Sequence, residues 1–112
     1  MLRETIDEAL EGIGVTGSNV DLELKPVKEK EQHFIQLISA EDETTAFTYL
    51  RFGKKRGSTY RWFFETKTPV AGTLYWSDDQ LVLNPSDRLI IRFNGTTTGD
   101  QLRANVQGFK KI

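Results

Sequence analysis

The sequence predicts an all-β protein: a single antiparallel β-sandwich or jelly roll of about seven or eight strands with a short N-terminal amphipathic helix. Three observations lead to this class. From residue 19 onward, apolar and polar residues alternate with the period of two that is typical of strands. Turn-forming residues separate these runs, and no run with a helical period lies between them. The length of 112 residues is that of one domain.

The first segment departs from the strand pattern. Four apolar residues lie at spacings of four, four and three with charged residues between them, which predicts an amphipathic helix over residues 2–13. Glycines at 12, 14 and 17 suit a helix end followed by a flexible link. We therefore expect an N-terminal arm, residues 1–18, and a β-sandwich domain, residues 19–112. The apolar stripe of this arm is a candidate assembly contact, formed by Leu2, Ile6, Leu10 and Ile13.

The first two predicted strands differ in how deeply they should lie. Residues 19–25 alternate between apolar and charged side chains, as a strand with one buried face does. Residues 33–40 are apolar on both faces, which predicts a strand inside a sheet. Strict alternation would place Ile35 and Leu37 on one face of that strand, and on the other Phe34, Ile38 and Ala40.

The remaining strands are separated by turn signals. Residues 46–52 and 58–66 are expected to form a hairpin around a loop at 53–57 that has a glycine at each end. Two short strands and two longer ones should follow, at residues 73–76, 80–83, 88–93 and 100–109. The sequence Asn84-Pro85-Ser86-Asp87 predicts a reverse turn before the third of these strands. In that strand Leu89, Ile91 and Phe93 should face inward, and in the last strand Leu102, Ala104 and Val106 should share one face.

Composition and charge exclude several classes of protein. The chain has no cysteine, which excludes a disulfide framework, a thiolate metal site and a cysteine nucleophile. The net charge of -1 hides an asymmetry: residues 1–50 hold eleven acidic and four basic side chains, and residues 51–112 hold five acidic and eleven basic ones. Such a split favours either a basic face for a polyanion or attraction between copies of the chain, unless the charges interleave in the folded domain.

No group of residues predicts an active site. His33 is the only histidine, so a structural role is the expected one. The acidic clusters Asp78-Asp79 and Glu41-Asp42-Glu43 lack the spacing of a calcium loop and are interpreted as solvated turns. We therefore expect no enzyme activity, no cofactor and no metal.

A basic and aromatic cluster in the hairpin is a candidate contact for a polyanion. Its basic residues are Lys54, Lys55, Arg56 and Arg61, preceded by Arg51, and its aromatic residues are Phe52, Tyr60 and Trp62. Such a hairpin can follow a phosphate backbone while its rings stack on unpaired bases. The alternative is a solubilising loop tip with partly buried aromatic residues. The acidic isoelectric point near 5.8 makes nucleic acid the less favoured ligand.

A second candidate contact combines aromatic and acidic residues. Tyr75 and Trp76 lie next to Asp78 and Asp79. A sugar ring packs its apolar face on an aromatic side chain, and its hydroxyl groups need fixed hydrogen-bond partners. This pattern favours a glycan site, and the alternative is that Trp76 is a core residue of a sandwich strand.

The stretch from Trp76 to Phe109 resembles small β-sandwich proteins among the virion structural proteins of tailed bacteriophages. Their pattern has a strand ending in a Pro-rich turn, an Arg-Leu-x-x-x-Phe strand, and a Gly-Asp pair that opens a last strand closing on Gly. The run Phe34 to Ala40 is similar to an early strand of that family. At the position of Ser86 the family often has Gly. The matching residues are Leu83, Pro85, Arg88, Leu89, Phe93, Gly95, Gly99, Asp100, Leu102 and Gly108.

This resemblance implies a non-enzymatic part of a virus particle: a head decoration, head-fibre or tail-associated subunit. Its partners would be copies of itself and other virion proteins, with a host-surface glycan as a further ligand and no membrane. Its location would be the virion, after synthesis in the host cytoplasm, because the chain shows no signal peptide. A carbohydrate-binding or host-adhesion module is the alternative function, and a single-stranded nucleic-acid binder through residues 51–61 is the second alternative.

Overall fold

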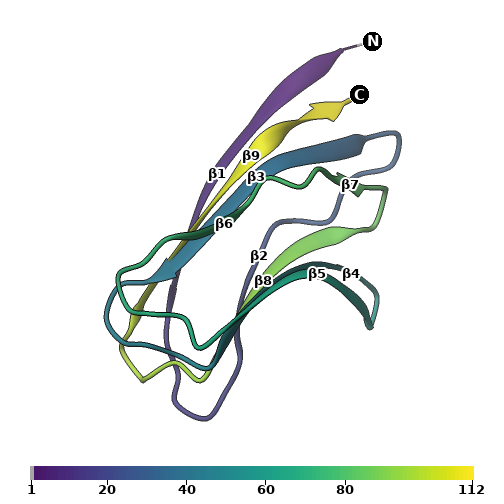
Figure 1. Ribbon diagram of the computed structural model, residues 1–112. Helices are drawn as coiled ribbons and strands as arrows, with labels where there is room; N and C mark the ends of the chain where they lie inside the picture. Colours follow the sequence, from purple (N-terminus) through teal and green to yellow (C-terminus); the bar gives the residue numbers. More distant parts are fainter. Residues whose placement is uncertain (1) are drawn as a thin grey trace.

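The computed structural model describes residues 2–112, and in this range the protein is all-β with no helix. Two antiparallel sheets face each other across a hydrophobic core (Figure 1). The absence of helices in the described range also means that no helix there is long and apolar enough to span a bilayer. The described part of the chain forms nine strands: β1 (Arg3–Ile13), β2 (Val20–Glu23), β3 (Gln32–Asp42), β4 (Tyr49–Arg56), β5 (Thr59–Lys67), β6 (Tyr75–Ser77), β7 (Leu81–Leu83), β8 (Arg88–Asn94) and β9 (Gln101–Lys111).

The order of the strands shows that neighbours in the sequence are mostly not neighbours in a sheet. One sheet has the order β1-β9-β3-β6, and β7 also pairs with β3. The other sheet has the order β2-β8-β4-β5. Because β6 pairs with residues 38–40 of β3 and β7 with residues 33–35, these two short strands cover consecutive parts of the same partner. Among residues 2–112, only β4 and β5 form a hairpin of strands adjacent in the sequence.

The core confirms the inward faces that alternation predicts for the last two long strands. Leu89, Ile91 and Phe93 of β8, a strand of the second sheet, are buried in the core between the two sheets. In β9, the buried side chains are Leu102, Ala104 and Val106. Polar residues fill the alternate positions on β9, as expected for a sheet with one solvated face.

The predicted N-terminal helix is wrong. Residues 3–13 form strand β1, which pairs with β9 over eleven consecutive residue pairs, from Arg3 opposite Lys111 to Ile13 opposite Gln101. The spacing of four between residues 2, 6 and 10 is an even number, so it places these side chains on one face of a strand as well as on one face of a helix. The segment predicted as a separate arm is therefore an edge strand of the first sheet, and the division at residue 18 does not separate it from the sandwich.

Strand β3 departs from simple alternation at one point. Its pairing with β9 shifts register between Ile35 and Leu37, which is a β-bulge at Gln36. The extra residue reverses the alternation, so Ile35, Ile38 and Ala40 are all buried, whereas strict alternation separates Ile35 from the other two. The prediction that β3 lies inside a sheet is confirmed, because β9 flanks it on one side and β6 and β7 flank it on the other.

The basic hairpin is longer than the sequence predicts. The expected loop at residues 53–57 is mostly strand, because β4 continues to Arg56 and the turn is confined to Gly57 and Ser58. Gly53 allows this continuation: a Cβ atom there would lie 2.5 Å from the Trp62 ring and 2.5 Å from the Arg61 carbonyl oxygen. The basic residues between 54 and 56 therefore alternate between two faces of a strand, which decides where each of them points.

Candidate functional site

The four apolar residues predicted as an assembly stripe do not share one surface. On β1, Ile6 is buried in the core with an exposed fraction of 9%, and Leu10 is half-buried against it. Leu2 and Ile13 are 71% and 55% exposed. Ile13 differs in parity from the other three, so it lies on the outer face of the strand. The stripe is thus divided between the core and two exposed ends of an edge strand.

Strand β1 is the acidic edge of the molecule. It carries four acidic side chains, Glu4, Asp7, Glu8 and Glu11, against one basic residue, Arg3. One side of its backbone pairs with β9, and the other side pairs with no strand of the described chain. Such an edge exposes backbone N–H and C=O groups that another strand can use.

The hairpin of β4 and β5 is the basic edge. Residues 49–67 hold six basic side chains and one acidic residue, Glu65. The second sheet has β2 at one edge and β5 at the other. The edge strand β1 of the first sheet contacts β2, so it lies at the end of the sandwich away from β5. The acidic and basic edges therefore lie on opposite flanks of the sandwich, as Figure 1 shows.

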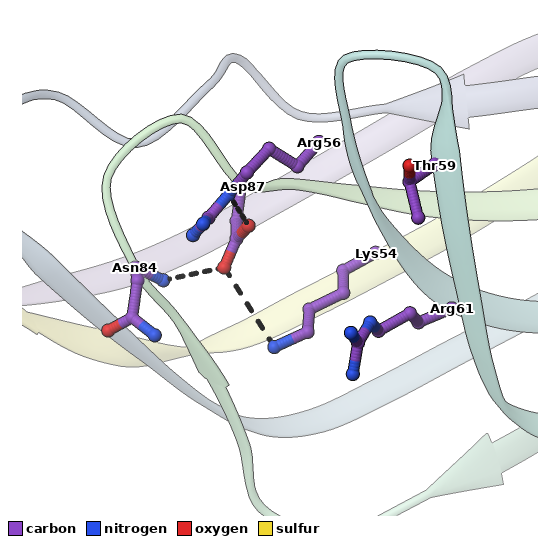
Figure 2. A pocket seen from close by; sticks show the side chains of 6 residues that line it. All are labelled: Lys54, Arg56, Thr59, Arg61, Asn84 and Asp87. Carbon is purple, nitrogen blue, oxygen red and sulfur yellow. Dashed lines mark hydrogen bonds and ion pairs between the residues drawn. The ribbon is translucent and has the colours of Figure 1, made fainter.

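The four basic residues predicted to contact a polyanion separate into two groups. Lys54, Arg56 and Arg61 line a pocket of about 340 Å³, together with Thr59, Asn84 and Asp87 (Figure 2). Lys55 points to the opposite face of β4, where its Nζ lies 5.1 Å from the centre of the Tyr60 ring. Alternation along β4 explains this separation, because residues 54 and 56 share a face that excludes residue 55.

Asp87 organises this pocket, and the sequence pattern does not reveal its role. Its Oδ1 accepts a hydrogen bond from Arg56 Nε at 2.9 Å, and its Oδ2 accepts one from the Asn84 backbone N–H at 2.9 Å. Lys54 Nζ lies 3.8 Å from Oδ2 and donates to the Val82 carbonyl oxygen at 3.3 Å. The turn at residues 84–87 was predicted correctly, but it is distant in sequence from the hairpin, so no local pattern shows that the two meet.

The outer face of the second sheet holds the aromatic residues of the hairpin. The Tyr60 and Trp62 rings stack with centres 5.6 Å apart, and the Arg92 guanidinium lies about 5 Å from both centres. Asp21 accepts two hydrogen bonds from Arg92, at 2.8 and 3.0 Å, and these bonds raise the pKa of Arg92. Since this cation already has a carboxylate partner, the face offers less charge to a polyanion than the sequence indicates.

The other predicted members of that cluster have similar partners or lie in the core. Arg51 donates to Glu65 at 2.6 Å and lies over the Tyr49 ring at 4.2 Å. Phe52 is fully buried and stacks on Phe64 inside the core. Neither residue is therefore available to unpaired bases in the way that the nucleic-acid hypothesis requires.

The predicted glycan residues do not form one platform. On strand β6, Tyr75 faces inward and packs against the core, and its hydroxyl oxygen accepts a hydrogen bond from the Val70 N–H at 2.8 Å. Trp76 points to the outer face and is 58% exposed, so the alternative of a core tryptophan is wrong. Asp78 and Asp79 lie exposed on the turn that follows. An exposed tryptophan beside two carboxylates remains available for a ligand.

Two carboxylates are buried at the end of the sandwich where residues 42–45 meet residues 96–100. Asp42 is 0% exposed, which corrects its interpretation as a solvated turn residue. Its Oδ1 accepts hydrogen bonds from the N–H groups of Thr44 and Thr45, and its Oδ2 has no partner among the described residues. Burial and the proximity of Asp100 raise the pKa of Asp42. A second buried carboxylate nearby disfavours the charged form of Asp42 in the same way that burial does.

The pKa of Asp100 shifts in the opposite direction in the same environment. Burial opposes ionisation, but hydrogen bonds from the Thr45 hydroxyl and from the Thr97 N–H lower the pKa of Asp100. The pair joins the turns after β3 and before β9, and this role is structural. Across residues 2–112, no three His, Asp or Glu side chains gather closely enough to hold a metal ion.

His33 has a local partner. Its Nε2 lies 3.2 Å from Glu31 Oε1, and hydrogen bonding to His33 is the main cause that lowers the pKa of Glu31. Glu31 also lies near Lys110, at 3.8 Å. This arrangement supplies a charge contact at the end of β3 and leaves no second acid or nucleophile beside the imidazole in the described contacts.

Comparisons with protein-family models, with curated proteins and with solved structures gave no match to this chain. A functional assignment therefore depends on the fold and on the surfaces described above.

Proposed function

We propose that this chain is a non-enzymatic structural subunit of a tailed-bacteriophage particle that works through contacts with copies of itself and with other virion proteins. The strand order carries this proposal. If β6 and β7 count as one interrupted strand opposite β3, the sandwich has eight strands, and its two sheets have the order of a jelly roll. Jelly rolls build viral capsid domains and lectins. Because one fold serves many functions, the virion context comes from the sequence resemblance.

The residues that carry the resemblance have structural roles, which supports a likeness at the level of the fold. Leu89, Phe93 and Leu102 are core residues. At Gly108 a Cβ atom would lie 2.1 Å from the Phe34 carbonyl oxygen, so only glycine fits. Ser86 has a φ of 75°, in the left-handed region that favours glycine, and the resembling family often has glycine at this position.

The edges of the sandwich supply a way for copies to join. The acidic strand β1 and the basic hairpin of β4 and β5 lie on opposite flanks, so the acidic edge of one copy can face the basic edge of the next. This contact joins two different surfaces, and repeated contacts of that kind build rings or open rows. Exposed charges of this type attract over about 8 Å at physiological ionic strength, so the contact is expected to weaken with salt.

The test of the virion proposal is the protein content of purified particles. Tailed phages would be induced from the organism that carries the gene, purified on a density gradient and analysed by peptide mass spectrometry. We expect peptides of this chain in the particle fraction, in a fixed ratio to the major capsid or tail protein. Recovery of the chain only in the soluble fraction of the lysate would contradict the proposal.

A glycan-binding function is the second candidate, and the exposure of Trp76 is the observation that favours it. In this proposal the ring of Trp76 receives a sugar face, and Asp78 and Asp79 accept hydrogen bonds from hydroxyl groups. A glycan array compares the wild type with Trp76→Ala and, as a control for an exposed aromatic residue elsewhere, Tyr60→Ala. Binding that only Trp76→Ala abolishes supports the site. Binding that survives Trp76→Ala, or no binding at all, removes it.

A further inference from the structure

The pocket between the basic hairpin and the turn at residues 84–87 carries an inference beyond the proposed function. Three cationic side chains reach it from two adjacent strands, and the turn between β7 and β8 closes the opposite side, as Figure 2 shows. The lining also includes Thr59 and Asn84. A volume of about 340 Å³ lies at the lower end of the range for small-molecule sites.

The single carboxylate in the pocket does not balance its charge. Three cations, Lys54, Arg56 and Arg61, face one anion, Asp87, which leaves an excess of two positive charges. Both oxygens of Asp87 already accept hydrogen bonds, from Arg56 and from the Asn84 N–H. Within the described residues, Arg61 makes no ion pair at all.

Two of the three cations that line the pocket are direct cross-strand neighbours. Lys54 and Arg61 form a residue pair between β4 and β5, and Figure 2 shows their charged groups side by side. Like charges at directly opposite positions destabilise a sheet. An anion between the two side chains would remove this repulsion and supply the acceptor that Arg61 lacks.

The uncharged polar residues of the lining define what the rest of the ligand needs. The Asn84 amide oxygen accepts a hydrogen bond from Gln32 Nε2 at 2.9 Å, so its NH₂ group is the part left to donate. The Thr59 hydroxyl can donate or accept. Together these groups suit a polar body with hydroxyl groups more than an apolar one.

We propose that this pocket binds the phosphate group of a small phosphate monoester with a polar, hydroxyl-bearing body. Arg61 and Lys54 would hold the phosphate oxygens, and Thr59 and Asn84 would contact the body. At neutral pH such a phosphate carries nearly two negative charges, which matches the excess charge of the pocket. Arg61 is the decisive residue because its guanidinium can donate two parallel hydrogen bonds to phosphate.

The experiment is a titration followed by two-dimensional amide NMR, with inorganic phosphate, glucose 6-phosphate and glucose as probes. We expect saturable shifts with both phosphate probes at the amides of β4, β5 and the 84–87 turn, and none with glucose. Arg61→Gln is expected to weaken binding by about tenfold or more, the factor for one charge-assisted hydrogen bond. The dispersed amide spectrum also confirms that each variant is folded.

Lys55→Gln is the matched control, because it removes the same charge from the same hairpin on the opposite face. Its affinity is expected to stay within about twofold of the wild type, the limit set by a distant, screened charge. Equal losses in Lys55→Gln and Arg61→Gln would overturn the proposal, because they would indicate diffuse attraction to the hairpin. Absence of saturable binding, or binding of inorganic phosphate without binding of glucose 6-phosphate, would overturn it as well.

Discussion

Ile6 tests most sharply whether the N-terminal segment belongs to the sandwich. Its side chain is 9% exposed and packs in the core cluster formed by both sheets. Replacing a buried Ile by Ala costs about 2–5 kcal/mol, depending on how well the site collapses. Because β1 is an edge strand with one open side, we expect Ile6→Ala to cost about 2–3 kcal/mol, the lower end of that range. For a domain of this length the melting temperature should fall by roughly 10 °C.

Ile13→Ala supplies the control within the same strand. Ile13 is 55% exposed, so its removal should change the free energy of unfolding by less than about 0.5 kcal/mol. Both variants would be measured by urea unfolding followed by circular dichroism. A helical arm docked by one apolar stripe predicts similar effects for the two residues. Equal losses, or a loss below about 1 kcal/mol for Ile6→Ala, would therefore refute the placement of β1 in the core.

Two further predictions concern buried groups of the sandwich. Asp42→Asn should gain stability relative to the wild type as the pH rises from 4 to 7. Because the pKa of Asp42 is raised, the folded wild type keeps a proton that its unfolded chain releases above about pH 3.9. The stability that the wild type gains from this proton is therefore full below that pH and is lost as the pH rises through the folded pKa, whereas Asn contributes no such term. Urea unfolding at several pH values measures this difference, and a constant difference would contradict the raised pKa of the buried Asp42. Gly108→Ala should destabilise by about 1–3 kcal/mol or more, because its Cβ would overlap the Phe34 carbonyl oxygen. An unchanged melting curve would show that this close approach of β3 and β9 is incorrect.

The strand pattern was predictable wherever turns and alternation agree. The strands from residue 20 onward all correspond to predicted runs, because each run has at least one apolar face and ends at turn-forming residues. The inward positions of β8 and β9 follow from the same rule. Sheet membership was not predictable, since only tertiary packing decides that β1 pairs with β9, the last strand of the chain.

The errors have local physical causes. The helix was predicted because spacings of four satisfy both periods, and only Ile13 breaks the strand alternation. The bulge at Gln36 shifts the faces of β3 without any glycine or proline to mark it. Asp42 was interpreted as a surface residue because nothing in its sequence context indicates the buried partner Asp100.

The candidate site was predicted only in part. The basic residues of the hairpin were identified, and alternation along β4 would have separated Lys55 from Lys54 and Arg56 if the strand had been extended through Gly53. The same rule separates Tyr75 from Trp76, which point to opposite faces of β6. Asp87, which closes the pocket, comes from a turn that no sequence pattern connects to the hairpin.

Sedimentation velocity at low and high salt most directly tests the claim that copies join through the acidic β1 edge and the basic hairpin. We expect oligomers of the wild type at about 50 mM salt that dissociate at about 500 mM, as the Debye length shortens. The variant Asp7→Lys/Glu11→Lys should stay monomeric at both, and Asp78→Lys/Asp79→Lys, with the same change of net charge on another surface, should behave as the wild type. A wild type that is monomeric at low salt, or equal effects of the two double variants, would contradict the account.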